Sequence, residues 1–352
     1  MAVEESDMTD REIWAGVARY WYNQDADRSP EVGRIQHHLA VLARPDALQQ
    51  LFYYTKALVS VRPFQNTRDS MILLFNSYDG IPLDQHSMVT AFIATHNVLF
   101  TRELPESYGT LANRFLSRLR EEFGRLGRQG QQGVYILSCN FASILQYGDN
   151  ESFIAMEFTQ NPGDTAAEAH KFALEWFAGT ASDTNTELVD PSLRISSQVA
   201  YQGSCLAFQT LAIFLDQIGD PNVYPGVHVS LAFIWCLALH PPAMQQLETM
   251  IPWLGIVNFL NTLFRPDTNL AKVESESFPI LDDAARQQLA EDFLIRGQTW
   301  SQLYYPAGFF DNAPSDDDRP VIEEVSAVIP RRHRCLWLGR RLTTVCQHVF
   351  LA

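Results

Sequence analysis

Apolar residues recur at every third or fourth position along most of the chain, and this spacing constrains the fold more than any other feature. It places apolar side chains on one face of an α-helix. Four such stretches lie near the N-terminus, at 11–22, 32–43, 46–58 and 66–77. Each connection between them contains a proline, which has no amide hydrogen to donate and therefore starts or ends a helix. The sequence predicts two antiparallel helix pairs, the arrangement of helical-repeat proteins.

The same spacing continues through the rest of the sequence. It predicts helices at 85–99, 106–126, 132–148, 164–180, 195–218, 226–240, 243–262, 283–296 and 331–350. No run alternates apolar and polar residues between hairpin turns, as antiparallel strands do. Stretches rich in Gly, Asp, Ser or Thr are predicted loops, at 124–133, 179–191 and 311–318. We therefore expect an all-α fold.

The composition is that of a folded protein without a membrane span or a disulfide framework. Of the 352 residues, 46% are hydrophobic and 19% are charged, which excludes wholesale disorder. The longest apolar run, 227–239, is too short to cross a bilayer. The five cysteines form no C-x-x-C pair, and the first ten residues are acidic, unlike a secretory signal. We expect a soluble intracellular protein with reduced cysteines.

Charge is distributed unevenly along the chain, whose formal net charge is -15. Residues 131–330 contain 25 acidic and 7 basic side chains, whereas residues 331–352 contain five arginines and no acid. An acidic surface repels nucleic-acid phosphates, so contact with RNA or DNA has to come from local arginine clusters. Arginine accounts for 23 of the 26 cations. This excess favours bidentate pairs with carboxylates or phosphates, although codon bias explains it equally well.

The C-terminal arginines allow two interpretations. They are Arg331, Arg332, Arg334, Arg340 and Arg341. In the first interpretation they form ion pairs with the acidic middle of the chain, for example with carboxylates at 316–318 or 323–324. In the second they bind nucleic-acid phosphates. We favour internal pairs, because the acidic region requires counter-charge, and we retain the five arginines as candidate nucleic-acid-binding residues.

No catalytic or metal-binding signature is found in the sequence. The glycine-rich stretch 124–133 lacks the Gly-Lys-Ser/Thr of a phosphate-binding loop, and 203–205 lies in a helical pattern rather than at a nucleophile turn. Adjacent His37 and His38 point about 100° apart on a helix, which favours packing or hydrogen bonding over metal binding. The aspartates at 316–318 are expected to be solvated. We expect no catalytic residue, metal or cofactor, and an enzyme with an unrecognised site is the least favoured class.

Aromatic residues occur in clusters at 20–22, 52–54, 304–305 and 309–310. In a helical array such rings mostly pack between helices. In the functional interpretation they line a peptide groove or form a platform on which nucleic-acid bases stack. Both interpretations remain open at this point.

The segment 30–75 resembles the EST/SMG family of telomerase-recruitment and nonsense-mediated-decay scaffolds. The matching elements are a glycine before a helix that carries an L-A-x-L-A-like run, an aromatic pair with a nearby basic residue, a Pro-Phe pair and a helix ending in L-L-F. They stand at Gly33, 39–43, 53–56, 63–64 and 73–75. Two later stretches, 291–310 and 331–342, are similar to the fungal branch of this family's DNA/RNA-binding domain.

The resemblance implies an architecture of two parts. Residues 1–80 would form the terminal TPR-like helix pairs of a truncated 14-3-3-like module, and residues 81–352 would form a helical-hairpin array of the DNA/RNA-binding type. Family members bind phosphorylated peptides, telomerase RNA or decay factors, and several carry a PIN nuclease domain. This sequence has only about two helix pairs before Pro63-Phe64 and no acidic nuclease quartet, so neither phosphopeptide binding nor nuclease activity carries over directly.

We therefore expect a non-enzymatic helical adaptor that binds protein segments in telomerase or mRNA-decay assemblies, in the nucleus, the cytoplasm or both. The alternative within the same fold is a module that binds RNA or telomeric DNA. Cations near the family-like motif provide candidate peptide- or phosphate-binding residues. They are Arg34, His37, His38, Lys56 and Arg62.

Overall fold

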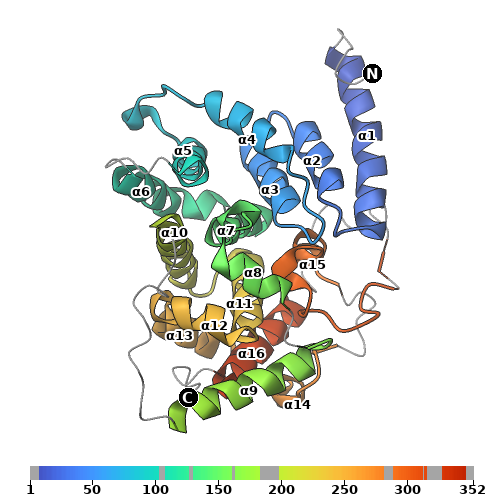
Figure 1. Cartoon of the computed structure of the whole chain (residues 1–352), viewed down its shortest axis with the longest axis vertical. Coiled ribbons are helices and arrows are strands. Elements are labelled where there is room, and N and C mark those ends of the chain that lie inside the picture. Colours follow the sequence, from blue (N-terminus) through green and yellow to red (C-terminus); the bar gives the residue numbers. More distant parts are fainter. Residues whose placement is uncertain are drawn as a thin grey trace.

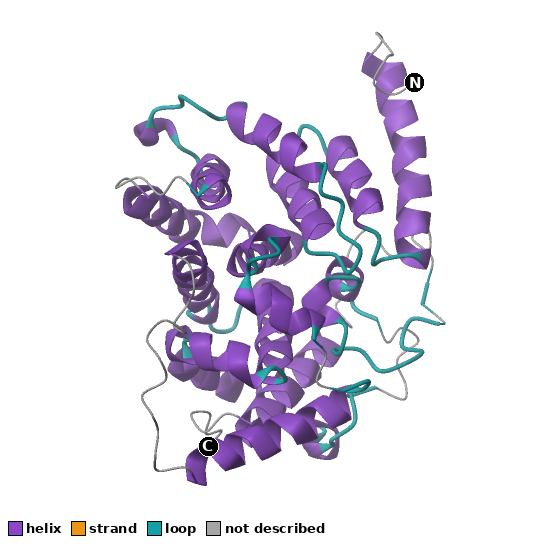
Figure 2. Ribbon diagram, in the orientation of Figure 1, coloured by secondary structure: helices purple, strands orange, loops and turns teal. Residues whose placement is uncertain are grey.

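In the computed structural model, the described residues form a helical body without a β-strand (Figure 1, Figure 2). They are residues 8–102, 108–126, 130–160, 163–182, 198–280, 288–311, 313–314 and 327–345. The all-α prediction is confirmed. The α-helices are α1 (Met8–Arg28), α2 (Gly33–Leu42), α3 (Ala47–Leu58), α4 (Thr67–Asn76), α5 (Met88–Thr101), α6 (Tyr108–Leu126), α7 (Gly130–Ile144), α8 (Phe153–Thr159), α9 (Ala166–Ser182), α10 (Gln198–Leu215), α11 (Tyr224–Ala238), α12 (Pro241–Leu247), α13 (Trp253–Leu263), α14 (Leu270–Glu274), α15 (Ala290–Ile295) and α16 (Val328–Val345).

Helix starts follow the capping residues. Asp46 caps α3, as the sequence predicts, because its Oδ1 accepts a hydrogen bond from Gln49 N at 2.9 Å. Ser87 caps α5 by accepting a hydrogen bond from Thr90 N at 3.1 Å. The helix therefore begins at Met88, three residues after the predicted start.

Several predicted boundaries are wrong. The predicted helix 243–262 is two helices, α12 and α13, because Pro252 lies between them. The predicted helix 283–296 shortens to the six residues of α15, and residues 281–287 lie outside the described residues. No apolar period predicts α8 or α14, because seven and five residues are too few to show one. Most of the predicted acidic loop 311–318 also lies outside the described residues.

The first four helices form two hairpins in which α1 packs against α2, α2 against α3 and α3 against α4 (Figure 1). Gly33 begins α2 where the chain approaches α3 closely, since a Cβ there would lie 2.3 Å from the carbonyl oxygen of Ala57. Leu39 and Leu51 are buried, whereas Leu42 is partly exposed.

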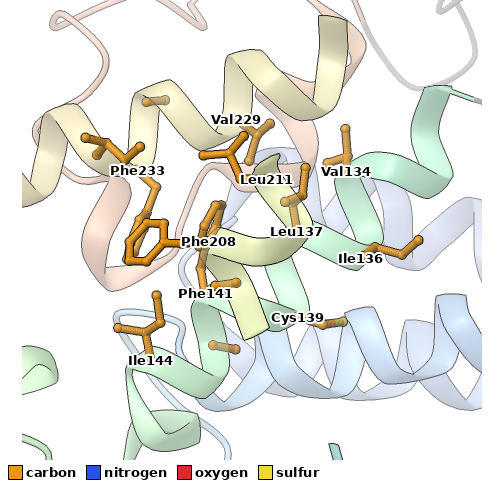
Figure 3. Packing of buried hydrophobic residues seen from close by; sticks show 14 of the residues in the cluster. Val134, Ile136, Leu137, Cys139, Phe141, Ile144, Phe208, Leu211, Val229 and Phe233 are labelled. Carbon is orange, nitrogen blue, oxygen red and sulfur yellow. The ribbon is translucent and has the colours of Figure 1, made fainter. Parts of the chain in front are cut away.

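Helix α7 crosses the centre of the body, where it packs against α3, α10 and α11. All of its residues from 133 to 144 are buried. Figure 3 shows its apolar side chains meeting those of α10 and α11, including Phe208. Phe141 stacks on Phe233 of α11 with ring centroids 4.2 Å apart. This cluster continues from α2 to α16 and so includes residues on both sides of position 80. The division at that position stays a prediction.

The segment 288–301, which contains α15, carries two adjacent buried carboxylates. Glu291 accepts hydrogen bonds from the Nε and Nη2 of Arg331 at 2.6 and 2.8 Å. Asp292 accepts from Arg334 Nη1 at 2.7 and 2.6 Å. Burial raises the pKa of Glu291, but the charge and hydrogen bonds of Arg331 outweigh it and hold that pKa well below its usual value. The resulting stabilisation is present above about pH 4.3 and is lost as the pH falls.

The same 288–301 segment contacts the N-terminal hairpins. Lys56 of α3 donates a hydrogen bond from Nζ to the carbonyl oxygen of Phe293 at 3.3 Å. A Cβ on Gly297 would lie 2.1 Å from the carbonyl oxygen of Pro30, in the connection between α1 and α2. The segment thereby joins α16 to the first helix pairs.

We expect Arg334→Met to lower the free energy of unfolding by about 3–5 kcal/mol, because the Asp292 carboxylate is then buried without its counter-charge. The matched control is Arg340→Met, which removes an exposed arginine of the same helix and should change the free energy by less than about 0.5 kcal/mol. Urea unfolding followed by circular dichroism measures both. Equal, small losses for the two variants would contradict the role assigned to the Asp292–Arg334 pair.

Candidate functional site

Three of the predicted site residues lie together on α2. His37 and His38 follow Arg34 by three and four positions, so all three lie on neighbouring parts of one helix surface. Arg34 is exposed, and the two histidines are partly exposed. Their helix is fixed at its start by the close approach of Gly33 to α3.

Aromatic rings from two other parts of the fold lie beside these three residues. Phe64, in the connection between α3 and α4, has its ring centroid 6.0 Å from Arg34 Cζ and 5.2 Å from the His37 ring centroid. Tyr22 of α1 stacks on His38 with centroids 4.9 Å apart and an interplanar angle of 24°. We call Tyr22, Arg34, His37, His38 and Phe64 the α2 surface. It combines one arginine with two histidines and two aromatic rings.

Both histidines of the α2 surface are held in the neutral form more strongly than free histidine. Burial lowers the pKa of His37, and neighbouring His38 lowers it further. Burial also lowers the pKa of His38, followed by the charge of Arg34. The Nδ1 of His37 lies 3.1 Å from Thr67 Oγ1 at the start of α4. Among the described residues, no carboxylate forms an ion pair with either histidine, and an added anion would favour protonation of both.

The other two predicted residues of this group are placed differently. Arg62 is exposed beside the start of α2, where Gly33 N donates a hydrogen bond to its carbonyl oxygen at 2.9 Å. Its guanidinium forms an ion pair with Glu31. Lys56 is buried, and its ammonium group donates to the 288–301 segment, so it is not part of the α2 surface. Helical periodicity alone does not predict that Arg62 is exposed and Lys56 is buried, because the partner of Lys56 is 237 residues away in sequence.

Two of the C-terminal arginines lie inside the protein. The side chains of Arg331 and Arg334 are 1% and 2% exposed, and they form the ion pairs with Glu291 and Asp292. A phosphate outside the protein has no access to side chains buried to this extent. The internal-pairing interpretation therefore describes both arginines, with partners on α15. The carboxylates that the sequence suggested as partners, at 316–318 and 323–324, lie outside the described residues.

The remaining three arginines of that group do not form a shared exposed surface. Arg332 Nη2 donates to Asp267 Oδ2 at 2.7 Å, and its side chain is 11% exposed. Arg341 is buried and donates to the carbonyl oxygen of Glu274 at 3.2 Å. Arg340 is exposed and donates to Thr343 within its own helix at 3.1 Å. The nucleic-acid hypothesis at this helix rests on Arg340 alone.

The aromatic members of the α2 surface were weaker signals in the sequence than its cations. Tyr22 belongs to the aromatic cluster 20–22, and Phe64 belongs to the Pro-Phe pair, but neither pattern indicates which ring packs against which cation. Tyr22 and His38 come together only through the hairpin formed by α1 and α2. A site of this kind can be predicted from a sequence that places an aromatic residue on one helix and a basic residue on the next, with a tight connection between them.

The described residues hold no group of three His, Cys, Asp or Glu side chains arranged as metal ligands. Within the same residues, no helix combines the length and the apolar character of a membrane span. His96, which is fully buried on α5, has a pKa lowered by burial to about 3, and its ring contacts Tyr147 and Asn140 rather than solvent. That network belongs to the core.

The comparison with protein families decides which known domain this arrangement resembles. The family model described as the Est1 DNA/RNA binding domain matches residues 18–176. The resemblance to the EST/SMG family is confirmed over this stretch. The Est1-type stretch runs from α1 into α9 and contains the whole α2 surface. It ends before α15 and α16, which carry the buried ion pairs. No curated protein matches the chain.

The geometry of the Est1-type stretch predicts the titration of its two exposed histidines. In NMR titrations, His37 and His38 should both have pKa values below the usual value of about 6.5. Arg34→Ala should raise the pKa of His38, because the arginine charge beside it is gone, and should change that of His37 less. Because folding lowers both values, the histidines oppose folding as the pH falls below about 6.5. A His38 pKa above the usual value would contradict the geometry.

Proposed function

We propose that this chain is a non-catalytic adaptor that binds single-stranded RNA or DNA on the α2 surface. The observation that supports the proposal most is the grouping of Arg34, two histidines and the rings of Phe64 and Tyr22 on one surface. Proteins that bind single strands combine cations for the phosphates with rings on which the bases stack. The family match adds support, since the matching domain is described as DNA/RNA binding.

Single strands suit this surface better than duplexes. The bases of a duplex are stacked on each other, so its phosphates are the groups most accessible to a protein. The described structure offers few exposed arginines near α2 for such a role, and the chain carries a net charge of -15. Stacking on Phe64 and Tyr22 requires unpaired bases, each worth about 1–3 kcal/mol in proteins of this kind.

A second function, docking of a protein segment, is favoured by the exposed side of α1. Five large apolar side chains lie within one third of its circumference, at spacings of three, four and seven residues. They are Ile13, Trp14, Val17, Tyr20 and Trp21. Helical-repeat proteins use such faces for neighbouring helices or for peptides.

The wider assignment is part of the same proposal. We infer that residues 1–80 act as TPR-like helix pairs of a 14-3-3-like module and residues 81–352 as a helical-hairpin array. We place the protein in telomerase or mRNA-decay assemblies, in the nucleus, the cytoplasm or both. Binding of phosphorylated peptides is the alternative use of Arg34, His37 and the neighbouring Arg62.

Arg34→Ala should weaken the binding of a fluorescent oligouridylate by about tenfold, because it removes a phosphate contact and the cation beside the Phe64 ring. The log–log salt slope should also become smaller by about 0.7, the value for one phosphate contact on a single strand. Fluorescence anisotropy measures both quantities. Arg120→Ala is the matched control, since it removes an exposed arginine on α6 within the same family match.

Equal affinity of the wild type and Arg34→Ala would contradict nucleic-acid binding at this surface. Arg340→Ala tests the remaining exposed arginine of α16, and a larger loss there than at Arg34 would move the site to the C-terminal helix. Tighter binding of a phosphoserine peptide than of the oligouridylate, with the same dependence on Arg34, would favour the peptide adaptor instead.

A further inference from the structure

Backbone strain is concentrated around the turn after α7. Three non-glycine residues among those described have positive φ: Arg102 at 61°, Gln146 at 49° and Tyr147 at 55°. Arg102 follows α5, and the other two follow α7. Non-glycine residues in this region of φ/ψ space are strained, and such strain concentrates at functional sites.

The surrounding core holds the strained turn after α7 in position. The hydroxyl of Tyr147 lies 2.7 Å from His96 Nδ1, and its ring centroid lies 5.2 Å from that of Phe100. The next residue, Gly148, approaches α3 so closely that a Cβ would lie 2.2 Å from the carbonyl oxygen of Leu58. The turn is therefore built into the fold rather than left to vary.

This arrangement brings two guanidinium groups together. Arg68 of α4 donates from Nη2 to the carbonyl oxygen of Tyr147 at 3.1 Å, and its Cζ lies 5.4 Å from the Phe100 ring centroid. Arg102 is exposed and forms an ion pair with Asp149. Burial lowers the pKa of Arg68; Asp149 opposes this effect, and Arg102 adds to it. The two guanidinium groups thus share the Asp149 carboxylate.

The arginine pair is linked to the α2 surface by a short stretch of chain. Arg68 follows Phe64 by four residues, and the Cζ of Arg34 lies 6.0 Å from the Phe64 ring centroid. Those four residues span at most about 14 Å of extended chain. Gln65, between them, is exposed and accepts a hydrogen bond from Arg68 Nε at 3.2 Å. Arg34 therefore lies near the Phe64 ring of the connection that leads into α4, and Arg68 near the start of α4 lies over the Phe100 ring.

We propose that Arg68 and Arg102 form a second phosphate-binding site, which holds the backbone of the same single strand that stacks on the α2 surface. This inference rests on the proposed function. Arg102 contributes an exposed guanidinium with donors beyond the one used by Asp149. The guanidinium of Arg68 is held by its hydrogen bond to the carbonyl oxygen of Tyr147 and supplies a second positive charge. The strained backbone at Arg102 and Tyr147 keeps both cations at this position.

Arg102→Gly separates binding from folding. Glycine adopts positive φ without steric cost and is common at the residue that ends a helix, so this variant should be at least as stable to urea as the wild type. It also removes one cation.

With an oligouridylate of about 16 nucleotides, the upper range of single-strand site sizes per domain, we expect Arg102→Gly to bind about five- to tenfold more weakly than the wild type. With one of about 4 nucleotides, which occupies the α2 surface alone, we expect little change. Arg102→Lys should retain most of the affinity, because it keeps the charge.

The outcomes distinguish this inference from the function on which it rests. If Arg34→Ala weakens binding but Arg102→Gly has no effect at either length, the second site is wrong and the α2 surface stands. If neither variant weakens binding, the proposed function itself is wrong. An equal loss for the long and the short oligouridylate would also overturn the second site, because a contact beyond the α2 surface has to depend on strand length. The control for the removed charge is again Arg120→Ala.

Discussion

The ion pairs of Glu291 with Arg331 and of Asp292 with Arg334 join α15 to α16, the last described helix, and the position of the 288–301 segment depends on them. A buried carboxylate is stable only when it is paired and hydrogen-bonded, so two adjacent ones fix both the position and the orientation of α15. The 288–301 segment then reaches α3 and the connection after α1. Arg331 and Arg334 of α16 are thus used for internal ion pairs. This leaves exposed Arg34 on α2 as the stronger candidate for binding.

The fold class was accessible from the sequence because helical spacing is a local property. Boundaries were accessible where a local cap determines them, as at Asp46. Boundaries could not be predicted where a proline divides an apolar run, as at Pro252. Nor could they be predicted where a helix is too short to show a period, as in α14. The role of Gly297 was also hidden, because the reason for glycine there is its approach to Pro30, far away in sequence.

The candidate site was accessible only in part. Arg34, His37 and His38 share a surface because they share a helix, which spacing reveals. Lys56 also lies near the family-like motif, but its side chain is buried, because its hydrogen-bond partner comes from the C-terminal part of the chain. The rings that complete the surface come from other elements, and no local pattern records such contacts. The pairing of Arg68 with Arg102 depends on the positive φ of Arg102, and the identity of a non-glycine residue does not predict a positive φ.

Photo-crosslinking tests most directly whether nucleic acid contacts the surface formed by the first helix pairs rather than the basic C-terminal helix. An oligonucleotide of 4-thiouridine can be irradiated on the full chain and the crosslinked peptides mapped by mass spectrometry. We expect the crosslinks at Tyr22 and Phe64, the rings available for base stacking. Crosslinks confined to α16, or spread over the surface without preference for these two residues, would contradict the account.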